Sequence, residues 1–360
     1  MNFAIFLFAL LLLNVNNCYG SNEELIQLHV LFRHGSRTPD EAPFYKTDPY
    51  ENENYYPFEK GQLTREGILQ SYRIGQDLRN CYNDFLGDIY TPDILHAVAS
   101  HFSRSKATLE AVLAGLFSPD ETQQFLPGLL WQPIPFEYKS EFNDNLLFIL
   151  RCQNYMKELE GFVNRQNLTQ HKDLFRFLTK HTGVPVKSSM IALALYHHLK
   201  TQQEMGLVLP SWTRKVFPNT LLKLTNKYYE DIYTDFNIQK IIPGNLLRYM
   251  IDESKQKIWN TNNRKIYLYS GHDHNLSSLL VVFGAYKGVP PYASYLILEV
   301  LQMDGVYGIK IKYQDYTKSE PYPIILKNCD EFCPLDKFEY LLKDIIPDKI
   351  SYCKQPNTST

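Results

Sequence analysis

The chain of 360 residues has little of what marks several large classes of protein. Basic residues are not in excess, since 37 Lys and Arg stand against 39 Asp and Glu, whereas a nucleic-acid-binding domain is normally clearly basic. After the N-terminal segment no apolar run approaches the ~20 residues of a membrane-spanning helix. No Gly-x-x-x-x-Gly-Lys phosphate loop, internal repeat or low-complexity tract occurs. We therefore expect a globular protein with no nucleic-acid partner and no membrane span.

Cysteine is scarce, with six residues, and the first of them lies in a predicted targeting segment. Residues 1–20 contain the apolar run Phe3–Leu13, too short to span a bilayer and followed by polar and then small residues, the pattern of a secretory signal peptide. The sequence thus predicts a secreted product in an oxidising compartment, where disulfides form. Cys329 and Cys333 enclose a very short loop and are expected to bond to each other. A zinc site is the alternative, although a second Cys/His pair at ligand spacing is lacking.

Residues 28–39, read Leu-His-Val-Leu-Phe-Arg-His-Gly-Ser-Arg-Thr-Pro, form the most informative stretch. The apolar half, Leu28–Phe32, is typical of a buried strand. The polar half places the cations Arg33 and Arg37 around the imidazole of His34, with a glycine for a close turn. In open α/β sheets ligands bind outside the carboxyl ends of strands, and the planar donor fork of arginine matches phosphate oxygens. We interpret this turn as an anion site, with a basic surface turn as the alternative.

Two later segments have the same order of strand, polar turn and helix. Leu95–Ala99 is predicted to be a strand that runs into a turn ending in Arg104. Ile266–Tyr269 is predicted to be another strand, followed by a turn that holds His272 and Asp273. If these strands are neighbours in one sheet, the three turns meet at the same edge. The structural alternatives are a helix N-cap for Asp273 and a surface ion pair for Arg104.

The overall pattern predicts an α/β fold with a mixed, mainly parallel sheet flanked by helices. Residues 21–128 and 253–360 contain the strand-to-helix units, and the alternating strands Tyr295–Leu301 and Val306–Tyr313 are expected to form a hairpin around an Asp-Gly turn. Residues 129–252 show little strand-like alternation and long helical stretches. We interpret this middle region as an inserted, mainly α-helical cap over the α/β core.

The motif Arg33-His34-Gly35-Ser36-Arg37-Thr38-Pro39 resembles the signature of the histidine acid phosphatases, the family that includes the prostatic, lysosomal and insect venom enzymes. Ser270-Gly271-His272-Asp273 is similar to the second motif of that family. The resemblance covers nearly the whole chain after the predicted signal peptide. Further matching stretches are Gly61–Thr64, Leu130–Pro135, Pro290–Ser294, Glu320–Pro323 and Cys329–Leu335.

The resemblance implies a role for each candidate site residue, and each role suits phosphoryl transfer. His34 would be the nucleophile, which becomes transiently phosphorylated. Asp273 would be the acid that protonates the leaving group, in keeping with an acidic working pH. The phosphate-binding residues would be Arg33, Arg37, Arg104 and His272. Because the arginines can neutralise the phosphate, we expect no metal site and no cofactor. A metal held by His272 and His274 is the alternative, but alternate residues of a strand end point to opposite faces.

The chain departs from the family pattern around Arg104. Where the family often has Arg-Ser-Thr-Asp-x-Asp-Arg-Thr, this chain has Val98–Ser105, so an arginine and both aspartates are replaced. The resemblance therefore leaves open how Arg104 is oriented. Other phosphatase chemistries lack their motifs, since no cysteine is followed by Arg six positions later and no Gly-Asn-His of the two-metal phosphatases occurs.

Together these patterns predict a secreted, metal-independent acid phosphatase that hydrolyses phosphate monoesters, either small molecules or phosphorylated peptides, through a phosphohistidine. The alternative is a secreted binding protein of the same fold that sequesters small ligands in its cleft. The resemblance also favours a disulfide between Cys152 and Cys353, which leaves Cys81 free or bonded between chains. Asn167 and Asn357 begin glycosylation sequons in a secreted protein, and the sequence is compatible with a homodimer.

Overall fold

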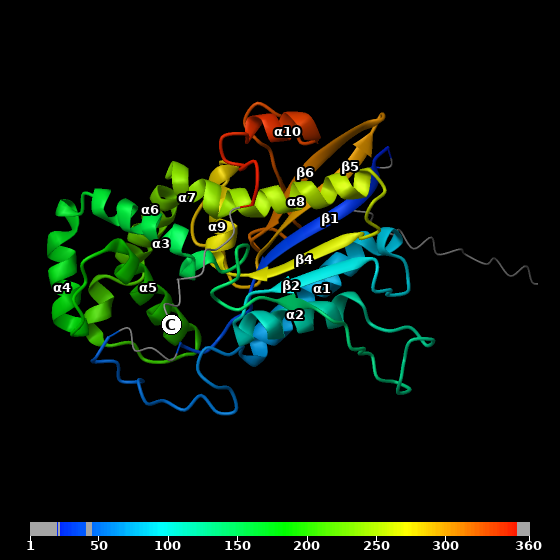
Figure 1. Cartoon of the computed structure of the whole chain (residues 1–360). Coiled ribbons are helices and arrows are strands. Elements are labelled where there is room, and N and C mark those ends of the chain that lie inside the picture. Colours follow the sequence, from blue (N-terminus) through cyan, green and yellow to red (C-terminus); the bar gives the residue numbers. More distant parts are fainter. Residues whose placement is uncertain (1–19, 21, 41–44, 351–360) are drawn as a thin grey trace, which may run out of the picture.

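The computed structural model describes residues 20, 22–40 and 45–350, and an eight-stranded sheet lies at its centre (Figure 1). The strands lie in the order β3-β2-β4-β1-β5-β6-β7, with β8 beside β6. Their bounds are Glu24–Arg33 for β1, Leu95–Ala99 for β2, Glu137–Tyr138 for β3, Ile266–Gly271 for β4, Tyr295–Met303 for β5, Val306–Gln314 for β6, Tyr322–Ile324 for β7 and Cys333–Pro334 for β8.

The sheet is mixed, as predicted, and its two halves differ in direction. Pairing is parallel from β3 through β2 and β4 to β1, and antiparallel from β1 through β5 and β6 to β7 and β8, so the sheet is not mainly parallel as predicted. The strands that precede the three polar turns, β1, β2 and β4, are neighbours in that half. Arg33 pairs with Gly271, and Ala99 pairs with Ser270, so the carboxyl ends of these strands lie at one edge. The predicted hairpin of β5 and β6 is also present.

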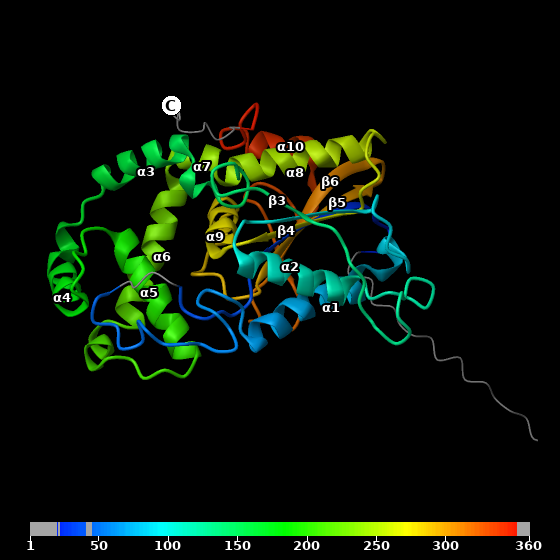
Figure 2. The ribbon, with the colours of Figure 1, turned by 60° about the horizontal axis from the view of Figure 1, so that its bottom comes forward.

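Helices cover both faces of the sheet, with α1 and α2 on one side and α8, α9 and α10 on the other (Figures 1 and 2). Their bounds are Arg65–Leu86 for α1, Ser103–Leu116 for α2, Pro243–Ile258 for α8, Asp273–Val282 for α9 and Leu335–Leu341 for α10. Leu28, Val30 and Phe32 of β1 pack in the core with α1 and α2. Leu31 packs on the opposite face with α8 and α9. Because successive side chains of a strand point to opposite faces, β1 is buried on both sides.

The remaining helices form a group beyond the end of β4 that bears its arrowhead (Figure 1). Their bounds are Gln153–Arg165 for α3, Lys172–Thr182 for α4, Ser189–Glu204 for α5, Asn219–Thr234 for α6 and Phe236–Ile241 for α7. These helices lie within the middle region that was expected to be a helical cap, and they enclose hydrophobic clusters of their own. The same region contains β3, which pairs with β2, and the first part of α8, which packs on the sheet. The division of the chain into core and cap stays a prediction.

The turn after β1 lies against the first turn of α1. Thr64 caps α1, because its side-chain oxygen accepts a hydrogen bond from the backbone N–H of Gly67 at 3.1 Å. A Cβ on Gly67 would lie 1.9 Å from the carbonyl oxygen of Ser36, and a Cβ on Gly35 would lie 2.2 Å from that of Gly67. This close approach requires glycine at both positions and fixes the backbone directly after His34.

Residues 45–60 join this turn to the helical group. The carboxylate of Asp48 is buried and accepts hydrogen bonds from Nε2 of His198 at 2.6 Å and from the amide of Gln202 at 2.9 Å, both on α5. The backbone N–H of Lys46 donates to the carbonyl of Thr182 on α4 at 2.8 Å. The segment that follows the β1 turn is therefore anchored to two helices that lie far from it in sequence.

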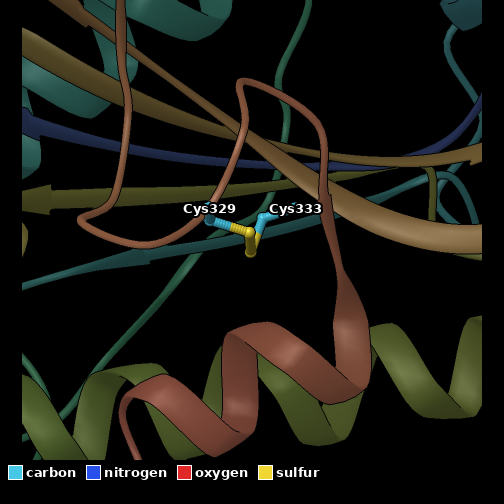
Figure 3. The surroundings of a disulfide bond; sticks show 2 residues. All are labelled: Cys329 and Cys333. Atoms are coloured by element: carbon cyan, nitrogen blue, oxygen red, sulfur yellow. A yellow bond between two sulfur atoms is a disulfide. The ribbon is translucent and has the colours of Figure 1, made fainter.

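Cys329 and Cys333 form the predicted disulfide, in the loop before α10 (Figure 3). Cys81 and Cys152 are also disulfide-bonded, and none of the described cysteines is free. The expectation of a free or intermolecular Cys81 is therefore wrong. It rested on the odd count of five cysteines that removal of residues 1–20 leaves. Cys353 lies outside the described residues, so its bond to Cys152 stays a prediction.

Other expectations on processing are not tested by the fold. Residues 1–19 and Asn357 lie outside the described residues, so the signal peptide and that glycosylation site stay predictions, as does the homodimer. Asn167 is exposed just after α3 and remains a predicted glycosylation site. Asn275 also begins a sequon, but it is buried and accepts a hydrogen bond from the backbone of His272 at 2.9 Å. No helix in the described ranges combines the length and apolar character needed to cross a membrane.

We predict that Gly67→Ala destabilises the protein by about 1–3 kcal/mol, because its Cβ would collide with a backbone carbonyl that cannot rotate away. Gly161→Ala in α3 is the matched control, since its Cβ would meet only the flexible side chain of Arg165, at 3.1 Å. The control should be neutral or stabilising by up to ~1 kcal/mol, because alanine favours helix. Denaturant unfolding measures both free energies, and equal values for the two variants would contradict the close approach.

Candidate active site

The three predicted turns meet at one edge of the sheet. Backbone pairing continues past the ends of the strands. The backbone N–H of His34 donates to the carbonyl oxygen of Gly271 at 3.2 Å, and the backbone N–H of Ser100 donates to the carbonyl oxygen of Ser270 at 3.1 Å. This pairing draws the turns together, and their side chains line a single cavity of about 500 Å³. The structure thus brings together all of the predicted site residues, Arg33, His34, Arg37, Arg104, His272 and Asp273.

His34 is a buried, neutral imidazole. Its Nδ1 lies 2.9 Å from the carbonyl oxygen of Gly35. A carbonyl can only accept a hydrogen bond, so Nδ1 carries the proton and Nε2 carries the lone pair. Burial, and then the positive charges of Arg104, Arg33 and Arg37, hold the pKa of His34 well below its usual range. The ring therefore keeps a nucleophilic nitrogen at acidic pH.

Arg33 is held on three sides. One terminal nitrogen of its guanidinium donates to the carbonyl of Pro290 at 2.6 Å, and the other pairs with the carboxylate of Asp273 at 2.8 Å. The guanidinium carbon lies 4.0 Å from the centre of the Tyr292 ring, a cation–π contact. Pro290 and Tyr292 belong to one of the stretches that match the family. These contacts orient the donor fork of Arg33 beside His34.

Arg37 and Arg104 are bridged by Asp40. One carboxylate oxygen of Asp40 lies 2.8 Å from Arg37, and the other lies 3.3 Å from Arg104. The guanidinium of Arg104 also lies 4.1 Å from the centre of the Phe102 ring. Burial, with a contribution from Arg37, lowers the pKa of Arg104 to about 10, so the group is charged at acidic and neutral pH. Asp40 and Phe102 orient Arg104 where the family often uses aspartates.

His272 lies across from His34, with 5.4 Å between the ring centres, and its Nε2 is 2.8 Å from the hydroxyl of Ser100. Burial, and then the charge of Arg104, hold the pKa of His272 well below its usual range, so the ring is neutral. His274 instead donates from Nε2 to the carbonyl of Leu147 at 3.2 Å, a contact that serves the fold. Within the described part of the chain, no group of three or more His, Cys, Asp or Glu is arranged to hold a metal ion.

Asp273 is an ionised carboxylate in this arrangement. Besides its pair with Arg33, it accepts a hydrogen bond from the hydroxyl of Tyr229 at 3.1 Å and lies 3.7 Å from Nε2 of His197. Burial alone would raise the pKa of Asp273, but Arg33 and the neighbouring histidines together outweigh burial and hold the pKa well below its usual range. For Asp273 to act as an acid, its pairing with Arg33 must weaken.

Three residues of the site were not predicted from the sequence, namely Asp40, His197 and Tyr229. Asp40 directly follows the signature, so its place in the sequence was a usable signal. His197 comes from α5 and Tyr229 from α6, and neither lies near a recognised motif. Two adjacent histidines in a predicted helix were the one available hint for His197. Burial lowers the pKa of His197 to about 4, against the opposing effect of Asp273, so this ring is also neutral.

Comparisons with known proteins agree with this site. Residues 24–314 match the model of the histidine phosphatase superfamily, branch 2, and the chain therefore belongs to that family. It is 36% identical over 337 residues to the venom acid phosphatase of Apis mellifera, covering 91% of this chain and 87% of the relative. It is 30% identical to the prostatic acid phosphatase of Bos taurus, covering 90% and 86% of the two chains. The resemblance predicted from the motifs is thus confirmed.

Solved structures share the fold at much lower identity. The phytase of Klebsiella sp. ASR1 aligns with a TM-score of 0.67 at 16% identity, over 91% of this chain and 97% of that chain. A phytase of Hafnia alvei in complex with myo-inositol hexakis sulphate aligns with a TM-score of 0.65 at 15% identity, over 94% and 100%. At such identities the similarity concerns the fold alone, and it confirms the predicted α/β class.

We predict that Arg104→Gln raises the pKa of His34, because it removes the charge that most strongly opposes protonation of the ring. In the folded protein His34 stays neutral, whereas in the unfolded chain it binds a proton below pH ~6.5. His34 therefore lowers the free energy of unfolding as the pH falls below that value, and the variant should lower it less. NMR titration, with the signal assigned through His34→Ala, measures the pKa. Arg151→Gln is the control, since Arg151 lines the cavity with a side chain that is 61% exposed. Equal pKa values in both variants would exclude this electrostatic origin.

Proposed function

We propose that the protein is a secreted acid phosphatase that hydrolyses phosphate monoesters through a phosphohistidine at His34, without a metal ion. The observation that carries the proposal is the neutral ring of His34, with its Nδ1 proton held by Gly35 and three arginines around it. A neutral imidazole nitrogen can attack phosphorus, and arginine forks can bind and neutralise the oxygens of the transferring group. The names of the relatives support the same reaction, since they are acid phosphatases.

The reaction takes two displacement steps. In the first, Nε2 of His34 bonds to phosphorus while the bond between phosphorus and the alcohol oxygen breaks, and that oxygen takes a proton from Asp273. In the second, a water attacks the phosphohistidine and gives its proton to Asp273, which releases inorganic phosphate and restores His34. Arg33, Arg37 and Arg104 bind the non-bridging oxygens in both steps, and His272 adds a hydrogen bond to them.

The proton on Asp273 must arrive with the substrate, because Arg33 keeps this carboxyl ionised in the structure. A phosphate monoester loses its second proton near pH ~6, so at lower pH it binds as a monoanion. Its oxygens then compete for Arg33 and place negative charge beside the carboxylate. Both effects raise the pKa of Asp273, and the proton passes from the phosphate to the carboxyl. An acidic working pH follows from the protonation state of the substrate.

A binding protein that merely retains the cleft is not favoured. A binder needs cations for a phosphate, but it gains nothing from a nucleophilic imidazole beside a potential proton donor. Secretion is part of the proposal because residues 1–20 have the composition of a signal peptide and because the described cysteines are in disulfides. The substrates proposed are phosphate monoesters, free or on peptides.

We predict that His34→Ala abolishes turnover of every substrate, whereas the effect of Asp273→Asn depends on the leaving group. Alkyl phosphates leave as basic alkoxides and should lose about 10²–10⁴-fold in kcat/KM, the usual contribution of a general acid. Aryl phosphates with an acidic phenol need little protonation and serve as the internal control, with a much smaller loss. The parameter kcat/KM is used because a slowed dephosphorylation does not affect it. Equal losses for both substrates would mean that Asp273 only positions the site.

We also predict that activity survives EDTA and gains nothing from added Mg²⁺ or Zn²⁺, because the arginines neutralise the transferring phosphoryl group. The measurement is phosphate release at pH ~5, the acidic range proposed above, before and after dialysis against the chelator. Loss of activity that a single added metal restores would overturn the assignment of the arginines and of His272.

A further inference from the structure

The two oxygens of the Asp273 carboxylate have different partners. Oδ2 pairs with a guanidinium nitrogen of Arg33 at 2.8 Å, whereas Oδ1 accepts a hydrogen bond from the hydroxyl of Tyr229 at 3.1 Å. Arg33 is one of the proposed phosphate-binding residues, so Oδ2 faces the place of the substrate. Oδ1 instead faces α6, which packs against both α5 and α9. The carboxyl group thus has one oxygen toward the reaction and one toward the helical group.

Tyr229 is a fixed hydrogen-bond donor. The residue is buried, and its ring stacks on that of Tyr233, with 5.9 Å between the ring centres and 8° between the planes. The ring of Tyr286 lies edge-on to it at 6.3 Å. Burial, and then the negative charge of Asp273, hold the pKa of Tyr229 well above its usual range. The hydroxyl therefore keeps its proton and its direction at acidic and neutral pH.

His197 extends this contact to α5. Its Nε2 lies 3.4 Å from the hydroxyl oxygen of Tyr229, and 3.7 Å from Oδ2 of Asp273, which is too distant for a hydrogen bond. Because the hydroxyl proton of Tyr229 is donated to Asp273, the hydroxyl oxygen accepts from His197, and the proton of the neutral ring lies on Nε2. His197 thus donates to Tyr229, which donates to Asp273. Each hydrogen bond in such a chain strengthens the next.

These contacts decide which oxygen of Asp273 can hold a proton. An oxygen that accepts a hydrogen bond in the ionised carboxylate binds a proton less readily, because the hydrogen bond favours the charged form. Both oxygens have a donor while Arg33 is in place. A bound phosphate competes for Arg33 and leaves Oδ2 without its partner, but Oδ1 keeps its bond to Tyr229. The proton that Asp273 gains with the substrate then resides on Oδ2.

Further charged and titratable groups face Asp273 and set how readily the carboxyl group as a whole binds a proton. Besides the three contacts above, they are His34 in the β1 turn, Arg104 of α2, Tyr233 of α6, His274 of α9 and Tyr286. The contact with Tyr229 differs from these, because it is a hydrogen bond to one oxygen and so distinguishes Oδ1 from Oδ2.

We propose that Tyr229 and His197 are positioning residues for the leaving-group acid, which keep the transferable proton of Asp273 on Oδ2, on the side of the alcohol oxygen. The inference rests on the proposed function, since it takes Asp273 as the acid. Both residues act through Asp273 rather than on the reacting atoms. Without the hydrogen bond to Oδ1, the protonated carboxyl can also hold its proton on that oxygen, where the alcohol oxygen is out of reach.

The test compares ethyl phosphate with 4-nitrophenyl phosphate in Tyr229→Phe, which removes the hydroxyl and keeps the ring. The kcat/KM of ethyl phosphate should fall on the order of tenfold, as for loss of a hydrogen bond to a charged group. That of the aryl ester should change much less, because its phenol needs little protonation. Tyr228→Phe is the matched control, since Tyr228 also lines the cavity from α6 but packs its ring on Phe162. Equal losses for both substrates would show a merely structural role and overturn the inference, as would an unchanged ratio.

The part of His197 is tested by two replacements. His197→Leu removes the donor to Tyr229 and should lower the ratio of ethyl to 4-nitrophenyl phosphate by about threefold, as for loss of a neutral hydrogen bond. His197→Gln should restore most of the ratio, because the carboxamide nitrogen of glutamine can donate from the place of Nε2. If the glutamine variant does no better than the leucine variant, His197 does not act as a donor.

The pKa of Asp273 separates this inference from the proposed function. NMR titration is carried out with saturating inorganic sulfate, which competes for Arg33 as the substrate does and keeps its charge over the working pH range, and Asp273→Asn assigns the signal. Tyr229→Phe removes a hydrogen bond to the ionised form, so the pKa should rise in this variant and not in Tyr228→Phe. An unchanged pKa overturns the inference, whether or not the protein is active.

The two hypotheses can therefore fail independently. If the unmodified protein turns over no phosphate ester yet the pKa of Asp273 rises in Tyr229→Phe, the proposed function fails and the positioning of the carboxyl by Tyr229 stands. If the protein turns over both esters and Asp273→Asn affects ethyl phosphate far more than the aryl ester, the proposed function stands. The same ratio of the two esters in Tyr229→Phe and in Tyr228→Phe would then overturn the inference alone.

Discussion

The site depends on the burial of three guanidinium groups side by side at one edge of the sheet. Like charges removed from water are costly unless they are paired. Asp40 pairs Arg37 and Arg104, and Asp273 pairs Arg33, so the buried cluster keeps a single net positive charge. That residual charge, together with burial, keeps His34 neutral in acid. The nucleophile, the anion site and the proton donor are thus consequences of one balance of charge.

Much of this site could be predicted because its residues follow their strands directly. Arg33 ends β1 and His34 follows it, and His272 comes immediately after β4, so predicting the strands was enough to predict the cluster. The orientation of Arg104 could not be predicted in this way. Its partner Asp40 is close to Arg37 in sequence, but it meets Arg104 only after the turns have been brought together.

The site residues that come from the helical group could not be predicted from the sequence for a related reason. His197 and Tyr229 reach Asp273 because α5 and α6 pack over the edge of the sheet, and this packing depends on contacts between segments far apart in sequence. Apart from the pair of adjacent histidines that includes His197, their own sequence neighbourhood carries no signal for this packing. Local patterns therefore predicted the site residues at the ends of the strands, but not those that α5 and α6 contribute.

The helix α5 contacts both the active site and the segment that follows the β1 turn. On α5, His197 faces Asp273, while the adjacent His198 binds Asp48 of the segment that follows the β1 turn. An insertion of one residue before them would turn both away by about 100° at once, so these positions are inherited or lost together. Met190 and Leu193 of the same helix line the cavity. Positions of this kind can change while the helix keeps its contacts with Asp273 and Asp48.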